Sequence, residues 1–115
     1  MMMNGNKEPL MKRIVLCCSA GMSTSLVVTK MEKTAVERGL DLKIYAIPEQ
    51  NLRDELEQHG SDIQAVLLGP QVRFKLAENK KLTDEHQIPI AVIDSVAYGT
   101  LNGAKVLDQA LSLVI

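Results

Sequence analysis

One segment near the start of the sequence combines residue types that could do phosphate chemistry. Cys18 is followed by a run of mostly small or hydroxyl-bearing residues, namely Ser19, Ala20, Gly21, Met22, Ser23, Thr24 and Ser25. Small side chains let backbone N–H groups turn toward an anion, and the first turn of a following helix adds unsatisfied donors and the positive end of its dipole. We therefore expect residues 19–25 to bind a phosphate group, with the Cys18 sulfur at the mouth of the loop.

A cysteine beside such a loop can act as a covalent nucleophile. Attack of its thiolate on phosphorus would carry a phosphoryl group as a thiophosphate, and this reaction needs chiefly positioning and charge stabilisation. A buried apolar cysteine beside an ordinary helix cap would have the same local sequence, and spacing alone gives the two interpretations of Cys18 equal weight. Cys17 continues the preceding apolar run and should alternate faces with Cys18, so we expect it in the core.

Comparison with known phosphate loops narrows the chemistry. Neither G-x-x-x-x-G-K-[ST] nor G-x-G-x-x-G occurs in the sequence. The spacing instead resembles that of low-molecular-weight tyrosine phosphatases, which have cysteine, five residues, arginine, and then serine or threonine. Here Thr24 takes the place of that arginine and Ser25 follows it. Without a guanidinium fork a phosphate dianion is held less tightly and is less activated toward water, which favours a phosphoryl carrier. A thiol-based phosphatase or arsenate-handling enzyme and a non-catalytic anion-binding module are the alternatives.

The composition limits the class of protein. The chain has 115 residues, 46% of them hydrophobic and 3% aromatic, and a formal net charge of -1 at pH 7. These values predict one domain with an aliphatic core and no nucleic-acid partner, because nucleic-acid binders usually carry a basic face. No apolar run approaches the roughly 18 residues of a membrane span. Two adjacent cysteines and two histidines give neither a disulfide framework nor a metal site, so we expect no metal and no cofactor.

Short apolar runs alternate with helical patterns along most of the chain. We expect a flexible tail over residues 1–11 and a single domain over residues 12–115, and we expect the protein to be a monomer. The runs of strand length are 14–17, 42–47, 63–68 and 90–93, and helical spacing covers 24–38, 51–59, 72–82 and 103–114. This alternation predicts an α/β three-layer sandwich with a four-stranded parallel sheet in the order 2-1-3-4, flanked by helices on both faces, resembling low-molecular-weight tyrosine phosphatases. Ligands of such sheets bind beyond the carboxyl ends of the strands, here at the end of the first strand.

Three blocks of the sequence resemble the IIB component of the bacterial sugar phosphotransferase system, in its lactose/cellobiose (chitobiose) class. The blocks are Ile14 to Ser25, Leu67 to Gln71, and Val92 to Ser95 with Tyr98-Gly99. The resemblance implies that Cys18 accepts a phosphoryl group from a phosphohistidine on a IIA protein. It further implies delivery to a β-linked sugar of cellobiose, chitobiose or lactose type, held by the membrane transporter IIC. A cytoplasmic protein peripherally associated with that transporter, and without metal, is what the family leads us to expect.

The resemblance also suggests which residues meet the partners. We expect a docking rim around the loop, made of Met22, Pro70, Gln71, Ala97 and Tyr98. Tyr98 could contact the phosphate or a partner, or could equally serve in packing or capping. For Asp94 we expect a structural hydrogen bond, because a carboxylate would be repelled by a nearby dianion.

Overall fold

The computed structural model describes residues 12–19 and 22–114, with the backbone but not the side chains of Met22 and Ser23. Within these ranges four strands form one sheet: β2 (Lys12–Cys18), β3 (Leu42–Pro48), β4 (Ile63–Leu68) and β5 (Ile90–Val92). The helices of the same ranges are α1 (Met22–Glu37), α2 (Leu52–His59), α3 (Leu76–Glu85), α4 (Ser95–Gly99) and α5 (Gly103–Val114). Two 3-10 turns, η1 (Glu49–Asn51) and η2 (Pro70–Lys75), precede α2 and α3. The tail expected over residues 1–11 lies outside the described residues.

The strands lie side by side in the order β3-β2-β4-β5, and each neighbouring pair is parallel. Counted along the described chain, this is the order 2-1-3-4 that the sequence predicts. β2 lies in the middle of the sheet and pairs Cys18 with Pro48 of β3 and Cys17 with Leu68 of β4. The chain leaves β2 toward one side and later crosses to the other, so the carboxyl end of β2 is the position where parallel sheets usually bind ligands.

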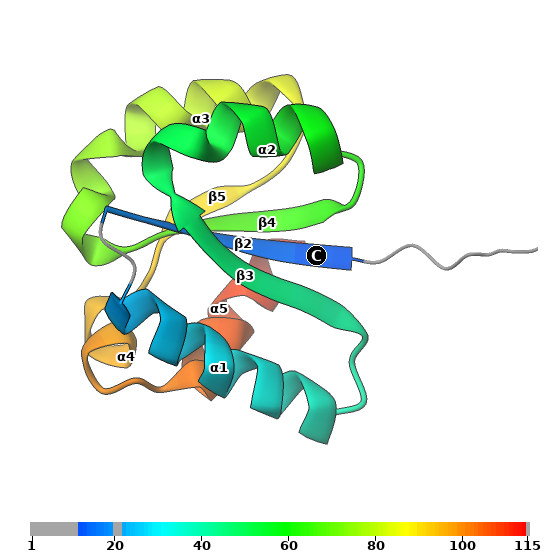
Figure 1. Ribbon diagram of the computed structural model, residues 1–115, viewed down its shortest axis with the longest axis vertical. Helices are drawn as coiled ribbons and strands as arrows, with labels where there is room; N and C mark the ends of the chain where they lie inside the picture. The colour runs from blue at the N-terminus through cyan, green and yellow to red at the C-terminus, as the bar shows by residue number, and fades with distance from the viewer. Residues whose placement is uncertain (1–11, 20–21, 115) are drawn as a thin grey trace, which may run out of the picture.

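Helices cover both faces of the sheet, as expected for a three-layer sandwich. In Figure 1, α2 and α3 lie on one side of the strands, and α1, α4 and α5 lie on the other. Side chains of β2 alternate between the two faces because successive residues of a strand point in opposite directions. Ile14 and Leu16 join the hydrophobic cluster beneath α1 and α5, whereas Val15 and Cys17 join the cluster beneath α2 and α3.

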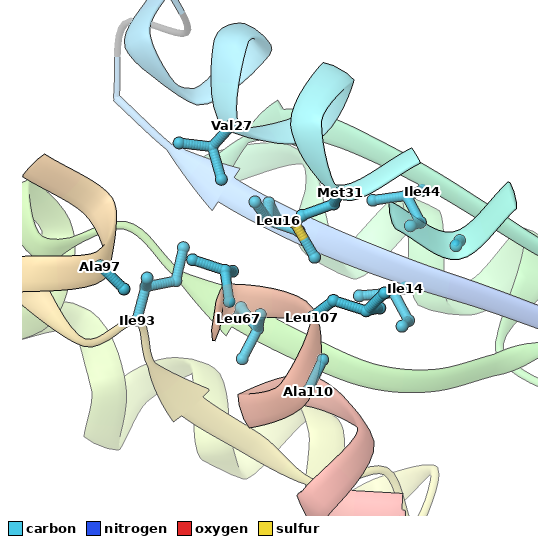
Figure 2. Packing of buried hydrophobic residues seen from close by; sticks show 12 residues of the cluster. Ile14, Leu16, Val27, Met31, Ile44, Leu67, Ile93, Ala97, Leu107 and Ala110 are labelled. Carbon is cyan, nitrogen blue, oxygen red and sulfur yellow. The ribbon is translucent and has the colours of Figure 1, made fainter. Parts of the chain in front are cut away.

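The cluster beneath α1 and α5 holds the start of α1 against the sheet. Figure 2 shows Leu16, Val27, Met31 and Leu107 converging between β2, α1 and α5, and each of them is fully buried. Burial of a side chain of this size contributes about 1.5–3 kcal/mol relative to exposure. Thr24, one turn before Val27, is also fully buried. Burial along the inner face of α1 therefore extends from Met31 back to Thr24 in the first turn.

Two segments differ from the predicted elements. The helix expected from residue 72 begins as the 3-10 turn η2, inside which Val72 has φ -117° and ψ 22°, and α3 follows only from Leu76. The segment after β5, to which the sequence analysis assigned neither helix nor strand, forms the short helix α4. Within residues 12–19 and 22–114, no helix has both the length and the apolar character that crossing a bilayer requires.

Candidate functional site

The segments that follow β2, β4 and β5 meet at the carboxyl edge of the sheet, because all strands run in the same direction. Cys18 is the last residue of β2, Ser19 after it is exposed, and α1 begins at Met22. The first turn of a helix leaves backbone N–H groups without helical partners, so α1 presents donors and its positive dipole end at this edge. Ala20 and Gly21, both expected to bind phosphate, lie outside the described residues.

The Cys18 thiol is more enclosed than the sequence predicts. Cys18 is 3% exposed, and its Sγ atom donates to the carbonyl oxygen of Ile47 on β3 across 3.8 Å. Alternation along β2 directs Cys18 to the same face as Leu16, which is the face that α1 and α4 cover. The sulfur therefore lies at the end of β2, on the side where α1 begins, and is almost fully buried.

Cys17 occupies the opposite face and has the properties of a core residue. It is fully buried within the cluster that includes Val15, Leu52 and Leu68. Burial, and to a smaller extent the nearby Glu49 carboxylate, raises the pKa of its thiol to about 12. Cys17 is therefore held as the neutral thiol, which is not the nucleophilic form. The sequence prediction that Cys17 belongs to the core is confirmed.

Hydrogen bonds join three loops beside Cys18. The Oγ1 atom of Thr24 lies 2.8 Å from the hydroxyl oxygen of Tyr98 in α4, and the Nε2 atom of Gln71 in η2 donates to the same oxygen over 3.1 Å. Thr24 follows β2, Gln71 follows β4 and Tyr98 follows β5. We call Thr24, Tyr98 and Gln71 the hydroxyl bridge. It links the start of α1 to the two neighbouring segments at the sheet edge without a charged side chain.

The approach of Gln71 depends on Gly69. A Cβ atom placed on Gly69 would lie 2.4 Å from the Oε1 atom of Gln71 and 3.3 Å from the Cys17 carbonyl oxygen. The Gly69 N–H also donates to that carbonyl over 2.7 Å, which holds the end of β4 against β2. A glycine at this position therefore leaves room for the Gln71 amide to fold back and reach Tyr98.

The position of Tyr98 is fixed by the ends of α4 and α5. Asp94 caps α4, since its Oδ2 atom accepts from the Ala97 N–H over 2.9 Å. The structural hydrogen bond expected for Asp94 is thereby confirmed. Gln109 of α5 holds the strand end before it, donating to the Val92 carbonyl over 2.8 Å and accepting from the Asp94 N–H over 2.9 Å. The sequence analysis missed Gln109. An amide next to the apolar residues of the last helix, here beside Ala110, was a signal that its side chain could bond to the sheet.

The residues expected on the docking rim have different exposures. Gln71 is exposed, whereas Pro70 and Tyr98 are half-buried. Ala97, which we placed on the rim, is 2% exposed and packs into the core. It faces inward because the segment is helical, and its neighbour Val96 is 71% exposed instead. Phe74 in η2, 76% exposed, is a second apolar residue that the sequence analysis did not select.

Of the residues expected to bind phosphate, Thr24 is fully buried while Ser19 and Ser25 are exposed. Within the described ranges, no three side chains of histidine, cysteine, aspartate or glutamate gather as a metal site would require. The arrangement thus places the Cys18 sulfur, the start of α1 and neutral hydroxyl groups at one end of the sheet. These groups can hold a phosphoryl group without a metal ion or an acid–base pair.

Comparisons with known proteins agree with the geometry. Residues 13–109 match the family model described as "PTS system, Lactose/Cellobiose specific IIB subunit". The chain is 42% identical over 105 residues to the oligo-beta-mannoside-specific EIIB component of Bacillus subtilis, an alignment covering 91% of this chain and 98% of the relative. It is 43% identical over 104 residues to the galactose-specific EIIB component of Lactococcus lactis subsp. cremoris, covering 90% and 96% of the two chains.

Solved structures show the same architecture. The solution structure of the cellobiose-specific IIB component from Borrelia burgdorferi is similar, with a TM-score of 0.72, 37% identity, and coverage of 93% of this chain and 94% of the other. The lactose-specific IIB domain from Streptococcus pneumoniae has a TM-score of 0.78 at 16% identity, covering 91% and 99% of the chains. At that identity the second likeness supports the fold alone.

Proposed function

The chain belongs to the lactose/cellobiose-specific IIB family of the phosphotransferase system, and we propose that Cys18 carries the phosphoryl group in that system. The donor in this proposal is a phosphohistidine on a IIA protein. The acceptor is a β-linked sugar of the cellobiose, chitobiose or lactose type, bound by the transporter IIC. The relatives are named for oligo-β-mannosides, galactose and cellobiose, so the proposal leaves the choice of sugar to IIC.

The proposed reaction consists of two phosphoryl transfers. In the first, the Cys18 thiolate attacks phosphorus, an S–P bond forms, and the N–P bond to the IIA histidine breaks. The thiol proton leaves to solvent before the attack, and the histidine nitrogen recovers a proton from solvent after it. In the second, a sugar hydroxyl attacks phosphorus, the S–P bond breaks, and the hydroxyl proton passes to solvent while the Cys18 thiolate is restored.

The residues after β2 supply the binding groups in this proposal. Backbone N–H groups of residues 19–25 and the dipole of α1 hold the phosphoryl oxygens, helped by serine hydroxyls. Where a phosphatase has arginine, this chain has Thr24, a neutral and fully buried residue that contacts Tyr98. A phosphoryl group held without a guanidinium is less activated toward water, which suits a carrier that must pass the group on.

A single observation carries the proposal. Cys18 is the last residue of the central strand, on the face covered by α1, and α1 begins four positions later. Its 3% exposure means that the proposed transfer includes an opening step, in which docking of IIA uncovers the sulfur. The docking rim we propose comprises Met22, Pro70, Gln71 and Val96. A cytoplasmic location, at the inner face of the IIC transporter, follows from these partners.

Intact mass spectrometry tests the proposal directly. Incubation with a phosphorylated IIA protein of the lactose/cellobiose class should add one phosphate to the chain. Cys18→Ser should abolish the adduct and Cys17→Ser should retain it, because Cys17 is buried on the other face. An adduct that persists in the Cys18 variant would overturn the assignment. Steady hydrolysis of an aryl phosphate by the wild-type chain would favour the thiol phosphatase alternative.

A further inference from the structure

We propose that the Tyr98 hydroxyl is a positioning group for phosphoryl transfer, which fixes the start of α1 in the geometry that holds the phosphoryl group on Cys18. This inference rests on the proposed function of Cys18. It assigns Tyr98 a role different from partner docking, and it makes the side chain of Thr24, as distinct from its backbone N–H, a structural contact of the phosphate loop rather than a phosphate ligand.

The contacts of Tyr98 support this role. Its hydroxyl oxygen accepts from Gln71 and lies 2.8 Å from Thr24 Oγ1, where either hydroxyl can donate. Thr24 is fully buried, so loss of this partner would leave a polar group short of a hydrogen bond in the core. The start of α1 is therefore held against Tyr98 by a contact whose loss would be costly in the core.

Tyr98 is itself held on rigid supports. Its ring packs against the cluster beneath α1 and α5, and Asp94 caps the short helix that carries it. Gln109 fixes the end of β5 just before that helix through its two hydrogen bonds. A hydroxyl held in this way keeps the start of α1 in a fixed position relative to the sheet, because α1 contacts it through Thr24.

The bridge lies on the face of the sheet to which Cys18 points. Every second side chain of β2 points to that face: Ile14 and Leu16 do, and Cys18 is the next in this series. A shift of α1 would move its N–H donors relative to the sulfur. Misplacement of reacting groups by about 1 Å can cost about 100-fold in rate, even when its source is remote from the chemistry. Loss of the Tyr98 hydroxyl should therefore slow the transfer step itself.

Single-turnover transfer from phosphorylated IIA, measured at several IIA concentrations, separates positioning from docking. We expect Tyr98→Phe to lower the maximal rate by about 10-fold or more, with little change in the IIA concentration that gives half of it. Thr24→Val should have a similar effect, and Thr24→Ser should recover most of that loss because it restores a hydroxyl. The double variant should be no slower than either single variant, since both remove the same contact.

Tyr45→Phe is the matched control. It deletes the hydroxyl of the other tyrosine, which donates to Glu55 and contacts Arg13, away from the bridge. We expect it to lower stability without changing the maximal transfer rate, which separates a positioning effect from a general loss of stability. If Tyr98→Phe transfers at the wild-type rate, or if the two bridge variants multiply in their effects, the positioning role is wrong.

The same experiment distinguishes failure of this inference from failure of the proposed function. A wild-type chain that gains phosphate on Cys18, together with an unimpaired Tyr98→Phe variant, overturns only the role of Tyr98. A wild-type chain that gains no phosphate from the donor overturns both. A higher half-saturating IIA concentration at an unchanged maximal rate would show that Tyr98 serves docking, which also contradicts the positioning role.

Discussion

Replacing Gly103 by alanine should push α5 away from α1 and destabilise the fold. Gly103 is the first residue of α5, and a Cβ atom added there would lie 2.5 Å from the carbonyl carbon and the Cβ atom of Lys30 and 2.6 Å from the backbone nitrogen of Met31. Carbon atoms normally approach to about 3.5–4.0 Å. The overlap is therefore about 1 Å, and it is largely with helix backbone that cannot rotate aside as a side chain could.

The size of the loss follows from this overlap. Overpacking a filled interior typically costs about 1–3 kcal/mol, and backbone contacts place Gly103→Ala near the upper end of that range. Alanine regains up to about 1 kcal/mol over glycine in a helix interior, but Gly103 is at the helix start and gains less. We expect the free energy of unfolding to fall by about 2 kcal/mol, which for a chain of this size corresponds to a decrease in Tm of about 10 °C.

Urea unfolding followed by circular dichroism measures this difference, with Gly99→Ala as its control. A Cβ atom on Gly99, in α4, meets no atom of the described residues within 4 Å, so that variant should keep or slightly increase stability. A Gly103→Ala variant within about 0.5 kcal/mol of the wild type, a difference typical of neutral surface changes, would refute the close approach of α1 and α5.

Three further predictions follow from the burial and hydrogen bonds of single side chains. Burial raises the pKa of Cys17 to about 12, so the native Cys18→Ser variant should resist alkylation by iodoacetamide at pH 8. In guanidinium it should be alkylated once per chain, as measured by intact mass spectrometry. Prompt alkylation of the native variant would contradict the burial of Cys17. Burial and the hydrogen bond to Glu55 raise the pKa of Tyr45 to about 12, so the neutral phenol stabilises the native state fully below pH 10 and loses that contribution as the pH rises toward 12. Absorbance at 295 nm in Tyr98→Phe, which retains one tyrosine, should accordingly titrate near pH 12, and a midpoint near 10 would be inconsistent with the contact. Gln109→Leu removes two hydrogen bonds from the end of β5 and should cost about 1–3 kcal/mol, with faster hydrogen exchange at the Asp94 amide; unchanged exchange there would contradict its bracing role.

The sheet could be predicted from the sequence because its strands are buried on both faces. Such strands appear as short continuous apolar runs, and the run over residues 63–68 coincides with β4 from Ile63 to Leu68. The order of the strands followed from the alternation with helices and the handedness of crossovers. The predicted ends of elements were less accurate. The helix predicted from residue 72 is preceded by the 3-10 turn η2, which starts at Pro70.

The short helix α4 could not be predicted by periodicity. Its five residues complete little more than one turn, so no pattern of 3.6 residues can repeat within it. Without a helical pattern, nothing in this segment indicated that Ala97, which we expected on the rim, would face inward. The Asp94 cap was a usable signal, because aspartate often precedes a helix and accepts from its first turn.

The contacts of the site depend on tertiary structure and could not be predicted from the sequence. Thr24 and Tyr98 are separated by 74 positions, and nothing local indicates that their hydroxyls meet. The placement of Thr24, Gln71 and Tyr98 at the carboxyl ends of the strands could be predicted. The pairing of their donors and acceptors required coordinates.

The neutrality of the hydroxyl bridge has a consequence for the phosphoryl carrier that we propose. Thr24, Tyr98 and Gln71 have no formal charge, so the arrival or departure of a phosphate dianion does not create or break an ion pair among them. An arginine in the place of Thr24 would instead bind the dianion strongly and favour the loaded state. A carrier must accept the phosphoryl group and release it again, and each kcal/mol spent on holding it raises the barrier to release. Neutral positioning of the loop by the bridge therefore suits transfer in both directions better than charged capture would.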